Sequence, residues 1–132
     1  MTRVALDPEF RALFEAVPAN YLVLAPDAAQ FTILAASDQY LAATLTTRET
    51  IVGRPLFDVF PDANPANTQR TGVANLRASL ETVLRTRATH RMEPQRYDVQ
   101  RPDGGWSVRY WAPRNTPILG PDGAVRYILH EV

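Results

Sequence analysis

The stretch RYDVQRPDGGWSVRYW, residues 96–111, consists of two runs of alternating residue types around the tetrapeptide Pro-Asp-Gly-Gly. Asp-Gly between alternating runs is the strongest short-range signal for a β-hairpin, because both residues accept the backbone angles of a two-residue turn. We therefore predict a hairpin whose turn is centred on Asp103 and Gly104. The alternation gives this hairpin one mostly apolar face and one face of opposite charges.

The predicted register determines what each face of the hairpin can do. It places Asp98 opposite Arg109, either as a cross-strand ion pair worth about 0.2–1 kcal/mol or as a clamp for a ligand. Trp111 lies on the same face, where its large ring suits a subunit interface. Tyr97 and Tyr110 lie on the apolar face, which we expect to turn toward the helices.

The rest of the chain supplies further strands. Residues 21–25 and 31–36 are short apolar runs bounded by turn residues, and apolar residues on both faces are typical of covered strands. Residues 124–132 form another run, which follows Gly-Pro-Asp-Gly. Together with hairpin strands predicted over 92–101 and 106–119, these runs indicate a five-stranded antiparallel sheet.

A helix is expected over residues 7–17, because Asp7 can cap it and a proline occupies the first helical position. Pro18 ends it. Four apolar residues recur at helical spacing and form one stripe: Phe10, Leu13, Phe14 and Val17. This stripe must be covered either by the chain's own sheet or by a second copy of the chain, and the sequence supports both alternatives.

More helices are expected between the second strand and the hairpin. A short helix capped by Ser37 is predicted over 37–45, and the spacing of Thr46 and Glu49 fits the capping box of another. Residues 63–71 are polar and contain proline, as loops do, and residues 72–87 have the apolar face of the longest helix. The segregation of helices and strands predicts an α+β fold.

Composition limits the classes of protein to which the chain can belong. Its 132 residues, 45% hydrophobic and 21% charged, suit a single globular domain. Basic and acidic residues number 14 each, so no net charge directs the chain to nucleic acid or to anionic membranes. The absence of cysteine excludes disulfides, thiolate metal sites and cysteine nucleophiles. No apolar run is long enough for a signal peptide or membrane span, so we expect a cytoplasmic protein without membrane insertion.

The order of the predicted elements and several local stretches resemble a PAS domain of the kind found in bacterial sensor histidine kinases and related signalling proteins. The resemblance runs from about Asp7 to Val132 and is carried by SDQYLAATL, GRPLFDVFPD, LETVLRTR, RPDGGWSVRYW and PILGPDGAVRYILHEV. It implies short helices and one longer helix on one face of the sheet, with an N-terminal amphipathic helix over 1–18 and the sensory domain over 19–132. Family members usually continue into a connecting helix, so we expect the output domain to be absent from this chain.

The resemblance also implies a small-molecule pocket between sheet and helices. We predict its lining from side chains that are aromatic or can form oriented hydrogen bonds: Tyr40, Phe57, Phe60, Asn75, Tyr97, Tyr110 and Asn115. The long helix lacks the histidine by which haem-binding members hold iron, and the chain lacks the cysteine of the flavin photoreceptors. The cofactor or ligand is therefore unknown at this stage, and a non-covalent flavin stays open.

Two other functions stay open. A ligand-free interaction module would have a filled core, an exposed apolar patch and a homodimer interface, for which we predict Phe10, Leu13, Phe14, Val17 and Trp111. A small cone-shaped α+β enzyme would abstract a proton with Asp98 or Asp38 and use Tyr40 as oxyanion donor. With two histidines and no nucleophile-elbow pattern, we expect neither catalysis nor a metal site. The sequence thus predicts a homodimeric signalling module that regulates an output partner such as a histidine kinase, in a two-component system, and that binds no nucleic acid.

Overall fold

The computed structural model describes residues 7–67 and 71–132, and the parts of our predictions that fall on residues 1–6 and 68–70 lie outside the described residues. A five-stranded antiparallel sheet with the order β2-β1-β9-β8-β3 forms the centre of the fold. Its strands are β1 (Tyr21–Leu24), β2 (Ile33–Ala36), β3 (His90–Arg91), β8 (Arg114–Leu119) and β9 (Val125–Glu131). The predicted α+β fold is confirmed.

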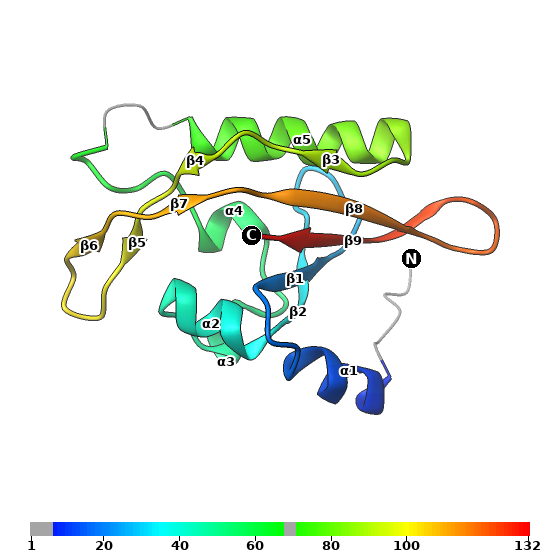
Figure 1. Cartoon of the computed structure of the whole chain (residues 1–132), viewed down its shortest axis with the longest axis horizontal. Coiled ribbons are helices and arrows are strands. Elements are labelled where there is room, and N and C mark those ends of the chain that lie inside the picture. Colours follow the sequence, from blue (N-terminus) through cyan, green and yellow to red (C-terminus); the bar gives the residue numbers. More distant parts are fainter. Residues whose placement is uncertain (1–6, 68–70) are drawn as a thin grey trace.

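Helices cover both faces of this sheet, with one helix on the outer face and the others on the inner face (Figure 1). The helices are α1 (Pro8–Glu15), α2 (Asp38–Thr44), α3 (Arg48–Ile51), α4 (Leu56–Val59) and α5 (Gly72–Thr86). In the central strand β1, Leu22 and Leu24 pack toward α2–α5, whereas Val23 packs with Phe14 of α1. The strand is therefore apolar on both sides because both sides are covered, as its sequence predicts.

Two of the three predicted helix caps are confirmed, and the third is wrong. The side chains of Asp7 and Ser37 accept backbone hydrogen bonds at the starts of α1 and α2, as expected. Helix α3 instead begins after Thr47, and no side chain caps it. The predicted capping box of Thr46 and Glu49 is therefore wrong, because the Thr46 hydroxyl lies 2.8 Å from the hydroxyl of Thr44.

The hairpin differs from its predicted register by one residue. Val99 lies opposite Ser107. A two-residue turn would have placed Val99 opposite Val108. The backbone N–H of Arg101 donates to the carbonyl of Gly105 at 2.7 Å, which closes a three-residue loop with Gly104 at φ +86°. A three-residue loop with a left-handed glycine is a common alternative to the two-residue turn, and it changes the pairing by one position.

The changed register overturns two expectations about side chains. The carboxylate of Asp98 does not pair with Arg109 across the strands but with Arg96 on its own strand, at 2.9 Å, and it also accepts from Asn64 at 2.7 Å. Tyr110 is 71% exposed and does not face the helices. These corrections follow from the register, because a slip of one residue exchanges the two faces of a strand.

The hairpin is also less regular than predicted. Its ladders are two short pairs, β4 (Gln95–Arg96) with β7 (Tyr110–Trp111) and β5 (Val99–Gln100) with β6 (Trp106–Ser107). Pro94 and Pro113 lie between these pairs and the main sheet, and a proline has no N–H to donate to a ladder. The predicted long strands are therefore broken, and the hairpin extends beyond the sheet (Figure 1).

Candidate functional site

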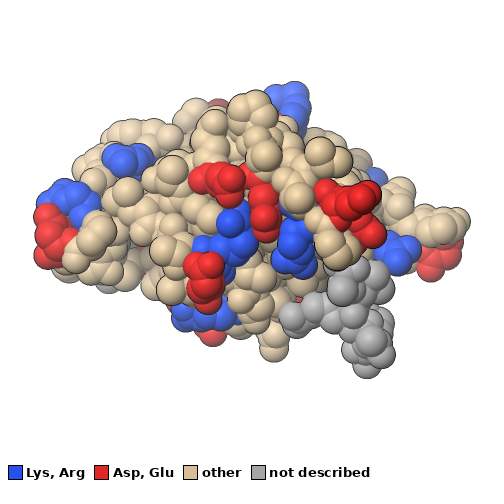
Figure 2. All heavy atoms as spheres, turned by 90° about the horizontal axis from the view of Figure 1, so that it is seen from below, with Lys and Arg blue, Asp and Glu red and all other residues tan. Residues whose placement is uncertain are grey.

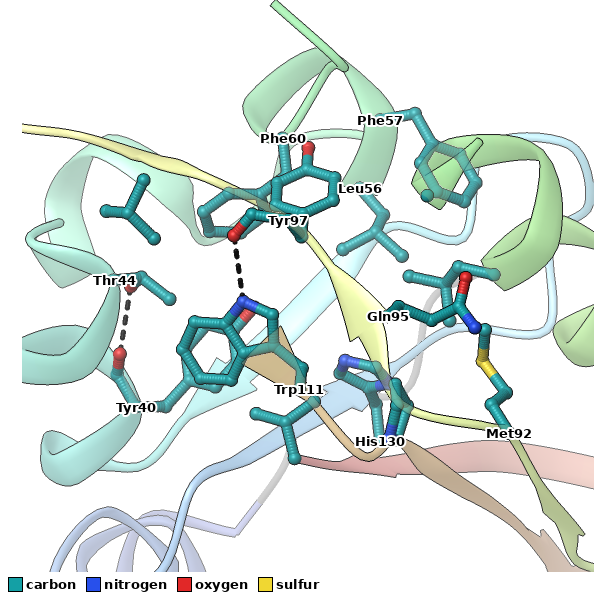
Figure 3. A pocket seen from close by; sticks show the side chains of 15 residues that line it. Tyr40, Thr44, Leu56, Phe57, Phe60, Met92, Gln95, Tyr97, Trp111 and His130 are labelled. Carbon is teal, nitrogen blue, oxygen red and sulfur yellow. Dashed lines mark hydrogen bonds between the residues drawn. The ribbon is translucent and has the colours of Figure 1, made fainter. Parts of the chain in front are cut away.

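A mostly apolar pocket of about 60 Å³ lies between the inner face of the sheet and the helices (Figure 3). Helix α2 contributes Tyr40 and Thr44, and α4 contributes Leu56 and Phe57. The hairpin forms a further wall through Trp111. Elements far apart in the sequence thus meet around one hollow, which is the usual construction of a small-molecule site.

Aromatic rings form much of the pocket wall. The ring centroids of Tyr40 and Phe60 are 6.0 Å apart and those of Phe60 and Tyr97 are 6.5 Å apart, both in edge-to-face geometry. The indole N–H of Trp111 donates to the carbonyl of Tyr97 at 2.9 Å, and this bond is drawn in Figure 3. Edge-to-face pairs and this partly buried N–H bond fix the orientation of the rings in the wall.

The structure brings four of the seven predicted ligand-binding residues to this pocket: Tyr40, Phe57, Phe60 and Tyr97. Asn75 lies on the exposed side of α5 and donates to the side chain of Gln95 at 2.6 Å. Asn115 is fully buried and bonds to the pocket residue His130, whereas Tyr110 lies outside the pocket. Trp111, predicted in the dimer interface, is half-buried and lines the pocket.

His130 is one of several lining residues that the sequence analysis did not place in the pocket. It is 3% exposed and its ring lies 6.4 Å from that of Tyr40. In β9, Tyr127 and Leu129 pack on the outer face with α1, and Ile128 packs in the core on the inner face. Alternation from Ile128 therefore places His130 on the inner face, and this signal was available in the sequence.

A chain of buried hydrogen bonds leads from this histidine to helix α5 and strand β3. Nδ1 of His130 lies 2.7 Å from Oδ1 of Asn115, and Nδ2 of Asn115 donates to the hydroxyl of Ser79 at 2.9 Å. The same hydroxyl lies 2.7 Å from Nδ1 of His90. Polar groups this deeply buried are costly unless they are bonded, so the chain fixes the orientation of each member.

Burial controls the protonation of the pocket residues. It lowers the pKa of His130 from 6.5 to about 4, so the imidazole is neutral at neutral pH. It also raises the pKa of the hydroxyl groups of Tyr40 and Tyr97. The pocket therefore presents neutral polar groups among apolar and aromatic side chains.

A second hollow lies on the outer face of the sheet, beside α1. This outer groove has a volume of about 340 Å³ and is lined by Phe10, Phe14, Val17, Tyr21, Val23, Ile118, Tyr127 and Leu129. Phe14 is buried against the sheet at 8% exposure, whereas Leu13 is 73% exposed. Helix α1 therefore covers its own sheet in part and also presents apolar side chains to solvent.

The carboxylates that an enzyme would need lie away from the pocket. Asp98 is held by Arg96 and Asn64, and the hydrogen bond from Arg96 holds the pKa of Asp98 below its usual value. Asp38 is exposed and forms an ion pair with Arg48 at 2.7 Å. Within the described residues, no group of three or more His, Asp or Glu lies together as metal ligands would, and no helix has the length and apolarity to cross a bilayer.

The family comparison agrees with this architecture. Residues 14–132 match the family model described as the PAS fold. The chain belongs to the PAS family. No curated protein matches the sequence. PAS domains are sensory and signalling modules, and the chain belongs to that class of domain.

Solved structures of PAS and LOV domains share the fold at low sequence identity. The Rhodobacter sphaeroides LOV protein is 16% identical with a TM-score of 0.64 over 96% of this chain and 66% of that one. The PAS domain of Bordetella pertussis BvgS is 17% identical with a TM-score of 0.67 over 93% of this chain and 81% of that one. Vibrio cholerae VqmA, named as a LuxR-type receptor with target DNA, is 19% identical with a TM-score of 0.63 over 96% of this chain and 51% of that one. This chain thus spans less than two thirds of the LOV chain and about half of VqmA.

Proposed function

We propose that this PAS domain is a cytoplasmic bacterial sensor that binds a small molecule in its core pocket. The hollow between sheet and helices is the observation that carries the proposal. Protein cores are packed to the density of organic crystals and contain few voids larger than a water molecule, yet this one keeps about 60 Å³ free among aromatic rings. This free space supports a ligand-binding core over the filled core of an interaction module.

The elements around the pocket suit the transmission of a signal. A molecule that contacts His130 touches the buried hydrogen-bond chain through Asn115 and Ser79, and thereby reaches α5 and β3. The output partner in this proposal is a signalling domain such as a histidine kinase of a two-component system. The distribution of charge supports a protein partner over nucleic acid. Acidic and basic side chains are interspersed on the face shown in Figure 2, so this face has no basic patch for phosphates.

Native mass spectrometry of gently purified protein, with an ultraviolet–visible spectrum, tests this proposal. We expect a reproducible extra mass, and absorbance beyond the tryptophan band if the molecule is a chromophore. The variant Leu76→Trp fills the pocket from α5 and should lose the extra mass. The control Leu84→Trp lies on the same helix and packs against the core away from the pocket, so it should keep the extra mass. Equal retention by both folded variants would contradict binding in the pocket.

We further propose that a second copy of the chain covers the outer groove. Phe10 and Leu13 project from α1 at 53% and 73% exposure, beside an apolar hollow on the same surface. A surface that carries both apolar projections and an apolar groove can complement itself about a two-fold axis, which is the commonest symmetry of soluble dimers. The resemblance to PAS domains, whose N-terminal helices often form the dimer, supports the same arrangement.

A further inference from the structure

Two polar groups of the pocket wall have no partner within the described residues, 7–67 and 71–132. His130 is 3% exposed and Tyr40 is 5% exposed, and both line the hollow. In that part of the chain no hydrogen bond involves Nε2 of His130 or the hydroxyl of Tyr40, and neither atom is among the polar atoms shut off from solvent. Each atom is therefore open to the hollow, where a ligand can bond to it.

The hydrogen-bond chain determines which kind of group Nε2 of His130 needs. The amide oxygen of Asn115 can only accept, so Nδ1 of His130 must carry the proton across the 2.7 Å contact. The amide nitrogen of Asn115 is used separately, because it donates to Ser79. A neutral imidazole with its proton on Nδ1 presents a lone pair at Nε2. His130 therefore offers the pocket a hydrogen-bond acceptor.

The surroundings of His130 exclude charged ligands. None of the pocket-lining side chains in the described residues is Asp, Glu or Arg. The neighbouring Glu131 is engaged elsewhere, in an ion pair with Arg114 and a hydrogen bond from the Tyr21 hydroxyl. Burial also keeps His130 neutral, since it lowers its pKa to about 4. A charged molecule in this pocket would lose its hydration without gaining an opposite charge.

The size and wall of the pocket define the shape of the ligand. An apolar cavity of about 150 Å³ holds benzene, so a pocket of about 60 Å³ suits a smaller molecule. The rings of Tyr40, Phe60 and Tyr97 and the indole of Trp111 favour a flat molecule, which can present faces and edges to them. Figure 3 shows His130 and Trp111 facing the same hollow.

We infer that the pocket takes a small, flat, uncharged molecule that donates an N–H or O–H hydrogen bond to Nε2 of His130. The inference rests on the proposed small-molecule function and specifies its ligand class. Such a bond completes the polar chain, so that ligand, His130, Asn115 and Ser79 form one continuous series of donors and acceptors. Donation to Nε2 strengthens the bond from Nδ1 to Asn115 in turn, because bonded groups polarise one another.

The tautomer of His130 can be measured directly on the wild-type protein. Long-range ¹H–¹⁵N spectra of the imidazole nitrogens distinguish a protonated Nδ1 from a protonated Nε2. We expect a protonated Nδ1 and an unprotonated Nε2 at neutral pH. A protonated Nε2 would overturn the inference before any ligand is added, because His130 would then present a donor to the pocket.

Three probes then test the ligand class: acetamide, acetone and acetate. They share one small flat skeleton, but acetamide donates an N–H, acetone only accepts and acetate is an anion. We expect acetamide to shift the Nε2 resonance of His130 and to bind about tenfold more tightly than acetone, the equivalent of one hydrogen bond. Acetate should not perturb the pocket.

The outcomes separate this inference from the proposed function. Acetone or acetate binding as well as acetamide would keep the small-molecule site but overturn the ligand class. If none of the probes perturbs the resonances of Tyr40, Trp111 and His130, the ligand class is overturned, and the native mass spectrum of the purified protein decides separately whether the small-molecule site stands. Tyr40→Phe removes the other unpaired polar group and should keep the preference for acetamide. A preference lost in that variant would assign the acceptor to Tyr40 and overturn the role given to His130.

Discussion

Nδ1 of His130 and Oδ1 of Asn115 lie 2.7 Å apart in the interior, on the neighbouring strands β9 and β8. This bond orients the imidazole of a residue that lines the pocket. It also connects the pocket wall to Ser79 on α5, because the Asn115 amide bonds to both residues. The fold therefore couples the interior of the sensor to its longest helix by side chains of fixed orientation.

Burial of His130 predicts a pH-dependent stability. Its folded pKa of about 4 lies below the unfolded value of 6.5, so the unfolded chain binds more protons between these values. The stabilisation that comes from a neutral His130 should therefore be fully present above pH 6.5. The free energy of unfolding should fall by about 3 kcal/mol as the pH drops to 4. Urea unfolding at a series of pH values measures this slope.

The variant His130→Gln should lose this component of the slope, although it will be less stable at neutral pH. His90→Gln is the matched control, because it replaces the partly exposed histidine at the other end of the same hydrogen-bond chain. A slope that disappears in His90→Gln and persists in His130→Gln would contradict the burial of His130.

Asp98 predicts a second, more acidic transition. The hydrogen bond from Arg96 lowers the pKa of Asp98, so its stabilisation is present above the unfolded value, about 3.9, and is lost as the pH falls through the folded value. Asp98→Asn should lower the unfolding midpoint at pH 7, and its difference from wild type should shrink below pH 4. Asp58→Asn, at an exposed site, should match wild type throughout. A constant difference for Asp98→Asn at all pH values would show that its charge contributes nothing.

Much of the fold could be predicted from the sequence because its signals are local. The stripe of α5, the caps at Asp7 and Ser37 and the apolar run of β1 each depend on neighbouring residues, and each predicts its element. The hairpin register could not be predicted, because Pro-Asp-Gly-Gly is compatible with loops of two or three residues. The three-residue loop shifts the pairing of the second strand by one position, so its side chains, including that of Tyr110, differ in facing from the prediction.

The pocket was harder to predict, since its residues come from seven helices and strands that only the tertiary fold brings together. Aromatic residues next to short helices, such as Tyr40 and Phe60, were sufficient to indicate part of the wall. Asn75 has the same chemistry as Asn115, but it lies on the exposed side of α5. Whether an asparagine is buried depends on the orientation of its helix or the register of its strand, and a change of one residue in either reverses the answer.

Gly104 holds the left-handed position of the hairpin loop, and its substitution tests how much this backbone angle contributes to stability. Its φ of +86° is unfavourable for residues with a Cβ, and no atom lies within 4 Å of the position that a Cβ would take. Gly104→Ala should therefore cost about 1–2 kcal/mol through backbone strain alone. Gly104→Asn should cost less, because asparagine adopts left-handed angles more readily. Equal losses for both variants in denaturant unfolding would show that this backbone angle does not control stability.

The proposed dimer can be separated from folding by two adjacent residues of α1. Phe14 is 8% exposed and packs on the sheet, so Phe14→Glu places a charge in the core and should unfold or strongly destabilise the domain. Leu13 is 73% exposed, so Leu13→Glu should leave the circular dichroism spectrum unchanged while light scattering shows a monomer. Val108→Glu, at a 52% exposed site on the hairpin, is the control and should remain dimeric. If Leu13→Glu stays dimeric and Val108→Glu dissociates, the copies meet through the hairpin and the outer groove is not the interface.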